Sequence, residues 1–214
     1  MKKTLILCLL GLFPMTAQAQ TGKHVSIGAA VGWRNMSDSR FSTKNPSPAF
    51  LYRFSRNPNE RKQGWVWRLG GTVGYTHADF SSDIGGADTK MGRLQTIAVL
   101  GGIERAYRHD RFKVGASVLA GPTFNSFAVD NAAREAYENR LGVPLEEVKV
   151  HNSLAVRSGV GTWYDVNNWV GVHAGVYKWF GQTTATTTAG GVSTEDTWKN
   201  DKLTASMGIA FGIF

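Results

Sequence analysis

The 214-residue sequence contains a single cysteine, at position 8, inside an apolar stretch near the start of the chain. The rest of the chain therefore has no thiol for a disulfide bond or a cysteine-based metal site. No apolar run reaches the roughly 20 residues that a membrane-spanning helix needs. The five histidines are scattered and lack the close spacing of zinc ligands. No Gly-x-Gly-x-x-Gly phosphate loop follows a predicted strand. We therefore predict no metal and no cofactor.

Basic residues exceed acidic ones, 24 to 16, but they form no dense cluster. A nucleic-acid-binding domain usually gathers its lysines and arginines on one face or along one element. The formal charge of +8 falls to +6 without Lys2 and Lys3, and we interpret it as a basic surface among anionic lipopolysaccharide. We predict no nucleic-acid partner.

The first 19 residues have the three parts of a secretory signal peptide. A basic pair at positions 2 and 3 precedes an apolar segment from Leu5 to Phe13, and Ala17-Gln18-Ala19 supplies a small-x-small cleavage site. The sequence thus predicts residues 1–19 as signal peptide and residues 20–214 as one exported domain of about 195 residues.

Apolar residues in the exported part recur at every second position, which is the period of a β-strand. In Gly64 to Ala78, for example, Trp67 and Leu69 alternate with Arg68 and Gly70. Eight such segments occur, each near the ~10 residues of a tilted transmembrane strand. They are His24 to Asn35, Ser47 to Arg56, Gly64 to Ala78, Arg93 to Tyr107, Arg111 to Phe124, His151 to Tyr164, Trp169 to Phe180 and Lys202 to Phe214.

One face of these segments is broad and aliphatic, whereas the other carries Gly, Ala, Ser and Thr with an occasional charge. In lipid, only helices and closed barrels satisfy every backbone polar group. An eight-stranded barrel has an interior just wide enough for side chains, so the small face suits the lumen and the aliphatic face suits lipid. The pattern predicts an all-β protein, an eight-stranded antiparallel up-and-down transmembrane β-barrel.

Short and long connections alternate between the predicted strands. The long ones are Met36 to Pro46, Ser81 to Gly92, Asn125 to Val150 and Gly181 to Asp201. With both termini in the periplasm they become four extracellular loops, as in other small barrels. Within them we expect a short helix over Asp130 to Leu141 and an extended strand over Thr183 to Thr188. We expect the loops to form a solvated cap over the barrel mouth.

Aromatic residues collect at both ends of the predicted strands, as expected of girdles at the two membrane–water interfaces. The predicted interface residues are Trp33, Trp65, Trp67, Phe112, Trp169 and Trp179.

The lumen face carries charges that must be paired to be stable in a closed interior. The predicted polar network comprises Arg53, Arg68, Glu104, Lys113 and Arg157. Our hypothesis centres it on Glu104, bonded to Arg68 and Lys113, with water or bound anions balancing the remaining positive charge. Two interpretations stay open: a plug of hydrogen bonds, or a thin path for anions.

The last strand has the polar-x-Gly-x-x-aromatic-x-hydrophobic spacing with which outer-membrane barrels commonly end. This predicted assembly signal comprises Ser206, Gly208, Phe211, Ile213 and Phe214. Together with Phe50-Leu51-Tyr52-Arg53-Phe54, Gly101 to Phe112 and Gly115 to Gly121, it makes the chain resemble the OmpX/Ail/Lom family of small outer-membrane barrels.

That resemblance implies an integral protein of a Gram-negative outer membrane, assembled by the barrel assembly machinery and surrounded by lipid and lipopolysaccharide. It also implies loops that act at the cell surface on a host or surface ligand, in adhesion or in resistance to host defences. Barrel scaffolds host several activities, so the resemblance transfers no functional residue.

Some small barrels modify lipid A with a histidine and a serine or aspartate at the outer rim. The candidates here are His77 with Asp79 and Ser81, and His151 with Ser153. A nucleophile needs a base within hydrogen-bond reach and a third orienting group, and the His-x-Ser-Asn pattern of deacylases is absent. We predict a non-enzymatic protein that displays loops or supports envelope integrity. The alternatives are a narrow porin for small or anionic solutes and a lipid A-modifying enzyme.

Overall fold

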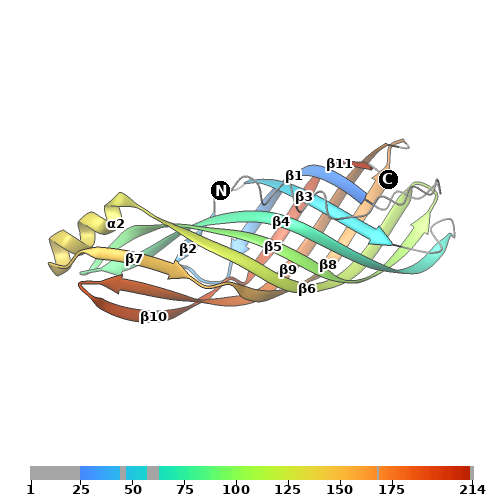
Figure 1. The fold of residues 1–214 in the computed structure, drawn as a ribbon. Coiled ribbons are helices and arrows are strands. Elements are labelled where there is room, and N and C mark those ends of the chain that lie inside the picture. Colours follow the sequence, from blue (N-terminus) through green and yellow to red (C-terminus); the bar gives the residue numbers. More distant parts are fainter. Residues whose placement is uncertain (1–24, 44–46, 57–62, 168, 213–214) are drawn as a thin grey trace, which may run out of the picture.

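The computed structural model describes residues 25–43, 47–56, 63–167 and 169–212, with the backbone alone for residues 25 and 47–56. The predicted signal peptide, residues 1–19, lies outside this range. Nearly all of the described chain is β-strand, drawn out into one elongated molecule (Figure 1). Among the helices of the described residues, none is long and apolar enough to cross a bilayer.

Eight antiparallel strands form a ring. In ring order they are β1 (Val25–Met36), β3 (Ser47–Arg56), β4 (Gly64–Ile84), β5 (Ala87–His109), β6 (Phe112–Val129), β8 (Ser153–Asp165), β9 (Val170–Ala189) and β11 (Lys202–Gly212). Each strand pairs with the next along the ring, and the β8–β9, β9–β11 and β11–β1 ladders close it. The predicted eight-stranded up-and-down barrel is confirmed, and β3 has the predicted bounds.

The predicted alternation also sets which side chains face inward. On β4, Trp67 and Leu69 are 61% and 64% exposed, whereas Arg68 and Thr72 are only 8% and 3% exposed. A soluble barrel would show the reverse. Exposed aliphatic residues recur on the other strands as well, among them Val31, Ile97, Ile103, Val118, Val160, Val176 and Ile209. Such a belt is the outer surface that a bilayer requires.

The four long connections are mostly regular structure and not open loops. The first contains the short strand β2 (Phe41–Ser42), which pairs with β4. The second is a direct continuation of β4 and β5, which turn at Gly85 and Gly86 with positive φ angles. The third contains β7 (Leu145–Val150), which pairs with β9. The fourth contains the outer part of β9 and the strand β10 (Val192–Lys199), which also pairs with β9. The predicted extension of the seventh strand is confirmed.

The predicted short helix is also confirmed. It consists of α2 (Asn131–Ala136) followed by a π-helical turn, η1 (Tyr137–Leu141). The Asp130 side chain caps α2 by accepting from the Ala132 backbone N–H. Gly142 ends the helical segment in the left-handed conformation, with φ of 69°.

We call residues 36–43, 78–94, 125–151 and 182–201 the extracellular module. It has its own apolar core, centred on Trp198, which is 2% exposed. The Trp198 ring lies 4.2 Å from the Phe80 ring, 5.3 Å from Phe127 and 5.5 Å from Phe41, measured between centroids. Buried around these rings are Ala78, Ile84, Met91, Leu94, Ala133, Ala136, Leu145, Val148, Val150 and Ala185. The expectation of a solvated cap is therefore wrong, because the strands enclose their apolar side chains.

A bulge shapes the start of the module. The β4–β5 register shifts between Phe80 and Ser81, and Gly92 stands opposite Phe80 with a φ of 154°. A Cβ at Gly92 would lie 2.2 Å from the Ala128 carbonyl oxygen. Only glycine therefore fits this close approach of β5 to β6.

The lipid-facing assignment makes a testable prediction at Val118. This side chain is 52% exposed and lies on β6 between Phe112 and Phe124, which are also exposed. In a bilayer, Val118→Arg should lower the free energy of unfolding by about 2–4 kcal/mol, as arginine does near the midplane of other barrels. Urea unfolding of the barrel in vesicles measures this. The control Ser126→Arg, exposed on the module part of β6, should change stability by no more than about 0.5 kcal/mol. Equal losses at the two sites would contradict the assignment.

Candidate lumen site

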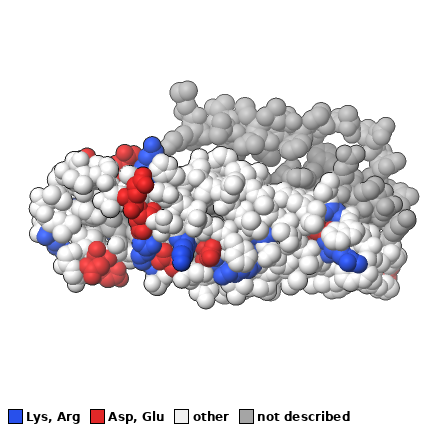
Figure 2. Space-filling model, turned by 90° about the horizontal axis from the view of Figure 1, so that it is seen from below, with Lys and Arg blue, Asp and Glu red and all other residues white. Residues whose placement is uncertain are grey.

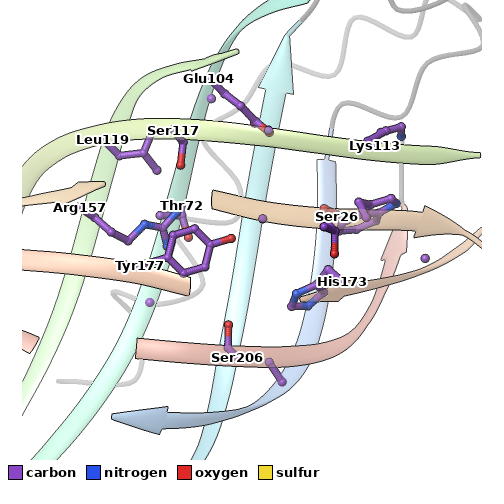
Figure 3. A pocket seen from close by; sticks show the side chains of 18 of the residues that line it. Ser26, Thr72, Glu104, Lys113, Ser117, Leu119, Arg157, His173, Tyr177 and Ser206 are labelled. Atoms are coloured by element: carbon purple, nitrogen blue, oxygen red, sulfur yellow. The ribbon is translucent and has the colours of Figure 1, made fainter. Parts of the chain in front are cut away.

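A cavity of about 190 Å³ lies inside the barrel, and we call it the lumen cavity (Figure 3). One end reaches Asp165 and Asn167, beside the short turn between β8 and β9. The other end reaches Trp179 and Lys202 below the extracellular module. It therefore extends through the periplasmic part of the barrel.

The lumen cavity is lined by more positive than negative side chains. Five basic residues (Arg34, Arg68, Lys113, Arg157 and Lys202) and two carboxylates (Glu104 and Asp165) face it. They come from six strands, with Arg157 and Asp165 both on β8, and each occupies an inward position of the alternation. Hydroxyl groups of Ser26, Thr72, Ser117, Thr204 and Ser206 lie between them.

The predicted polar network is present in part. Arg68 and Glu104 stand directly opposite each other on β4 and β5 and both line the cavity. The carboxylate that contacts Lys113, however, is Asp165, with 3.0 Å between Nζ and Oδ2. The prediction that Lys113 pairs with Glu104 is therefore wrong. Asp165 lies just beyond the predicted segment His151 to Tyr164, but it is the last residue of β8 and lines the lumen cavity. The side chain of Arg53 lies outside the described part of the chain.

Trp179 is not an interface aromatic, contrary to the sequence prediction. It faces the lumen, where the Arg157 guanidinium lies 5.6 Å and the Lys202 ammonium 5.0 Å from its ring centroid. It also packs against the apolar cluster around Leu100. Its neighbour Phe180 is the outward residue, 46% exposed. Two aromatics in succession must face opposite sides of a strand, so they cannot both belong to the girdle.

The other five predicted interface aromatics are 44–66% exposed: Trp33, Trp65, Trp67, Phe112 and Trp169. Trp169, in the short turn before β9, also lines the end of the lumen cavity. Arg105, also outward, lies 5.1 Å from the Trp65 ring and 5.4 Å from the Trp67 ring. Their role at the membrane surface stays a prediction.

Lys202 was missing from the predicted network although it is 4% exposed. Its Nζ donates to Thr76 Oγ1 at 3.3 Å and to Asn200 Oδ1 at 3.4 Å. The alternation of the strand could have predicted this position. Leu203 faces outward, so the residue before it must face inward. Lys202 opens the last strand, where the pattern has only begun.

Above Lys202 the barrel interior is filled. Leu100, Leu119, Ala98 and Ala155 pack together there, with Leu94 at the base of the module. Two further spaces at this level, lined by described residues, have volumes of only about 10 Å³ each. A volume of that order holds about one water molecule. The lumen cavity is thus blind at its extracellular end.

The predicted assembly signal lies partly outside the described residues, which exclude Ile213 and Phe214. Ser206 lines the lumen cavity and Phe211 is 56% exposed on the outer surface. At Gly208 a Cβ would lie 2.3 Å from the Ala29 carbonyl oxygen. This glycine thus lets β11 approach β1 where the ring closes, while its role in assembly stays a prediction.

The candidate catalytic groups have other partners. Asp79 accepts from Arg93 Nε at 2.8 Å and lies 3.8 Å from Lys90 Nζ. His151 Nε2 lies 3.4 Å from Thr186 Oγ1. Ser153 Oγ lies 2.7 Å from Thr123 Oγ1. These contacts do not arrange a serine against a histidine. In the part of the chain that the structure describes, no group of three or more potential ligands forms a metal site.

Solved structures share this architecture. The outer membrane protein OprG of Pseudomonas aeruginosa matches with a TM-score of 0.60 and 11% identity over 90% of this chain and 96% of its own. The outer membrane protein AlkL matches with a TM-score of 0.52 and 14% identity over 93% and 94%. Ail, the attachment invasion locus protein of Yersinia pestis, aligns with a TM-score of 0.44 and 13% identity over 88% and 95%.

No family model and no curated protein sequence matches the chain. The likeness to OprG and AlkL is one of fold. The chain is a small β-barrel of the outer-membrane type, and the predicted resemblance is confirmed at that level.

The Lys113–Asp165 pair makes a second prediction. Asp165 Oδ1 also accepts from the Trp163 indole N–H at 2.6 Å, so the carboxylate holds two side chains. Asp165→Ala should lower the free energy of unfolding by about 2 kcal/mol, since a buried amine and an indole lose their acceptor. Asp165→Asn, which keeps an acceptor for Trp163, should cost about 1 kcal/mol. Urea unfolding in detergent micelles measures both. If the two variants lose the same amount, the indole bond contributes nothing.

Proposed function

We propose that the chain is a non-enzymatic integral protein of the outer membrane that presents a rigid extracellular module to molecules outside the cell. The barrel anchors the chain in lipid and lipopolysaccharide, and the barrel assembly machinery is the partner expected during biogenesis. The observation that carries this proposal is the apolar core around Trp198, which holds the four long connections in one structure. A rigid scaffold that displays variable surface is a common site of recognition.

Charged contacts tie the module together across strands that are distant in sequence. Arg40 contacts Asp38 beside it and Asp196 on β10. Lys90 on β5 lies 3.5 Å from Asp130, the cap of α2, and 3.8 Å from Asp79 on β4. Figure 2 shows most of the acidic residues of that face at the end of the molecule that carries the module. Polar surface and apolar interior are what a domain in water requires.

The module tip presents two large apolar side chains. Leu141, at the end of η1, is 48% exposed, and Val192, at the start of β10, is 67% exposed. Two hydrogen bonds hold the turn from β9 to β10, just before Val192. Gly190 N–H donates to the Pro144 carbonyl, and Gly191 N–H donates to Glu146 Oε1. A host or surface ligand would meet this tip first.

The test compares cells that make the parent chain with cells that lack it, for attachment to host cells and survival in serum. Trp198→Ala should reduce both to the level of cells without the protein, because removing a buried tryptophan costs about 3–5 kcal/mol and loosens the module. Leu141→Ser with Val192→Ser should weaken attachment without unfolding the module. Val166→Ser, exposed in the short turn at the opposite end, is the matched control.

Heat-modifiable gel migration must show equal amounts of folded barrel in all strains. Full attachment and serum survival by the Trp198→Ala strain would refute the proposed role of the module. Mass spectra of lipid A should be the same with and without the protein. A changed lipid A profile would favour the enzyme alternative.

The module should also loosen in acid. The Arg93 guanidinium holds the pKa of Asp79 below its ordinary value of 3.8, and Arg40 does the same for Asp38. A carboxyl group with a depressed pKa stabilises the folded form above its unfolded pKa, and this stability is lost as the pH falls through its folded pKa. Amide exchange in β10 should therefore be constant from about pH 8 to 5, after correction for intrinsic rates, and rise below about pH 4. The double variant Asp38→Asn with Asp79→Asn should lack this rise. An identical acid response in parent and variant would contradict the assignment.

A further inference from the structure

We propose that the lumen cavity is a blind binding site, entered from the periplasmic end, for a small organic anion bearing a carboxylate or phosphate group. This site is separate from the extracellular module, since the filled interior above Lys202 lies between them. The outcome of a binding test at this site is therefore independent of the surface role proposed above.

The first support is the charge of the lining. Five basic side chains and two carboxylates share one enclosed space, and Asp165 already contacts Lys113. Arg34, Arg68 and Lys202 are each less than 9% exposed. Concentrated positive charge in a low-dielectric interior is costly unless anions approach it. A bound oxyanion supplies that compensation through charge-assisted hydrogen bonds.

The second support is a pair of buried hydroxyl groups. Thr72 is 3% exposed, and its Oγ1 has no hydrogen-bond partner within the described residues. Thr204 Oγ1 is likewise buried without a partner there, and both residues line the lumen cavity. Figure 3 labels Thr72, Arg157 and Tyr177 among the side chains that line the cavity. A buried polar group without a partner is uncommon in native proteins. Hydroxyls beside guanidinium groups are donors of the kind that bind carboxylate and phosphate oxygens.

The third support is the size and wall of the cavity. At 10–15 Å³ for each water, about 190 Å³ holds roughly a dozen or more waters, and so a solute of about ten non-hydrogen atoms. One wall is aromatic: the Trp163 and His173 rings stack with centroids 5.7 Å apart, and Arg157 lies 4.5 Å from the Tyr177 centroid. Such a wall contacts the body of an organic anion while the cations bind its charged end.

The experiment uses the purified barrel in detergent micelles and follows the tryptophan indole N–H signals by NMR. Benzoate and inorganic phosphate are the probes, titrated at constant ionic strength against chloride. The signals of Trp163 and Trp179, which line the cavity, should shift with saturation in the millimolar range. The signals of Trp65 and Trp67, on the outer surface, should stay in place and serve as internal controls.

Two lumen variants and one control variant on the outer face locate the site. Arg157→Gln should weaken probe binding at least about tenfold, which corresponds to about 1.4 kcal/mol. Arg105→Gln removes the same charge from the outer face, where Arg105 stacks on Trp65 and Trp67, and should leave binding unchanged. Thr72→Val, which removes only the hydroxyl, should weaken binding several-fold and keeps the proposal testable if Arg157→Gln fails to fold.

Each outcome decides the proposal. Saturable shifts of Trp163 and Trp179 that are absent at Trp65 and Trp67 and lost in the lumen variants support it, with benzoate tighter than phosphate if the aromatic wall contributes. Absence of shifts overturns it, as do equal shifts with chloride or equal effects of Arg105→Gln and Arg157→Gln. Discrete openings in planar bilayers would overturn the blind end and favour the anion-path alternative.

Discussion

Everything in this structure depends on one constraint: in lipid, each backbone N–H and C=O group must find a partner within the protein. Closing eight strands into a ring satisfies that demand, and the β8–β9 and β1–β11 ladders complete it. Closure then divides each strand into an inner and an outer face with a period of two. In so small and strongly curved a ring, some inward positions accept only glycine. At Gly208, for example, a Cβ would collide with the backbone of the neighbouring strand.

The apolar face changes sides along the strands, and this change locates the outer membrane surface. On β4, Leu69 and Tyr75 point outward, but higher on the same strand Ala78 and Phe80 are buried inside. On β5, Ile103 and Ile97 face outward, whereas Leu94 and Met91 face inward. The β4–β5 ladder continues through this level to Ile84 and Ala87, with a register shift between Phe80 and Ser81. What changes is the solvent, from hydrocarbon to water, so the same sheet is inverted from a membrane barrel to an ordinary water-soluble domain.

That inversion also explains what could be predicted from the sequence. The belt strands carry a broad aliphatic face, and alternation located all eight, with β3 at its true bounds. Beyond the belt, polar residues such as Ser81 and Asp83 suggested a loop, although Phe80 and Ile84 keep the period inward. In the lumen, parity identified Arg68 and Lys113 as inward but could not assign their partners. The partner of Lys113 follows from the β6–β8 register, which places Trp163 opposite Lys113 and Asp165 two residues farther along β8. Trp179 lies near the end of a predicted strand, as a girdle residue does, but Phe180 occupies the outward position there and Trp179 the inward one.

The side chains packed in the extracellular half of the barrel close the lumen cavity on that side. Leu100 and Leu119 pack together across the barrel, and the two further spaces described beyond Lys202 have volumes of only about 10 Å³ each. The positive charges below this plug are therefore separated from the outside medium. A through-channel would need its cations spread along the whole path, with weak binding at each point so that solutes leave again. Here Arg157 and Lys202 lie over the Trp179 ring at the closed end of the cavity, which Arg34 also lines. Charge concentrated at the bottom of a blind cavity favours retention of an anion over its passage.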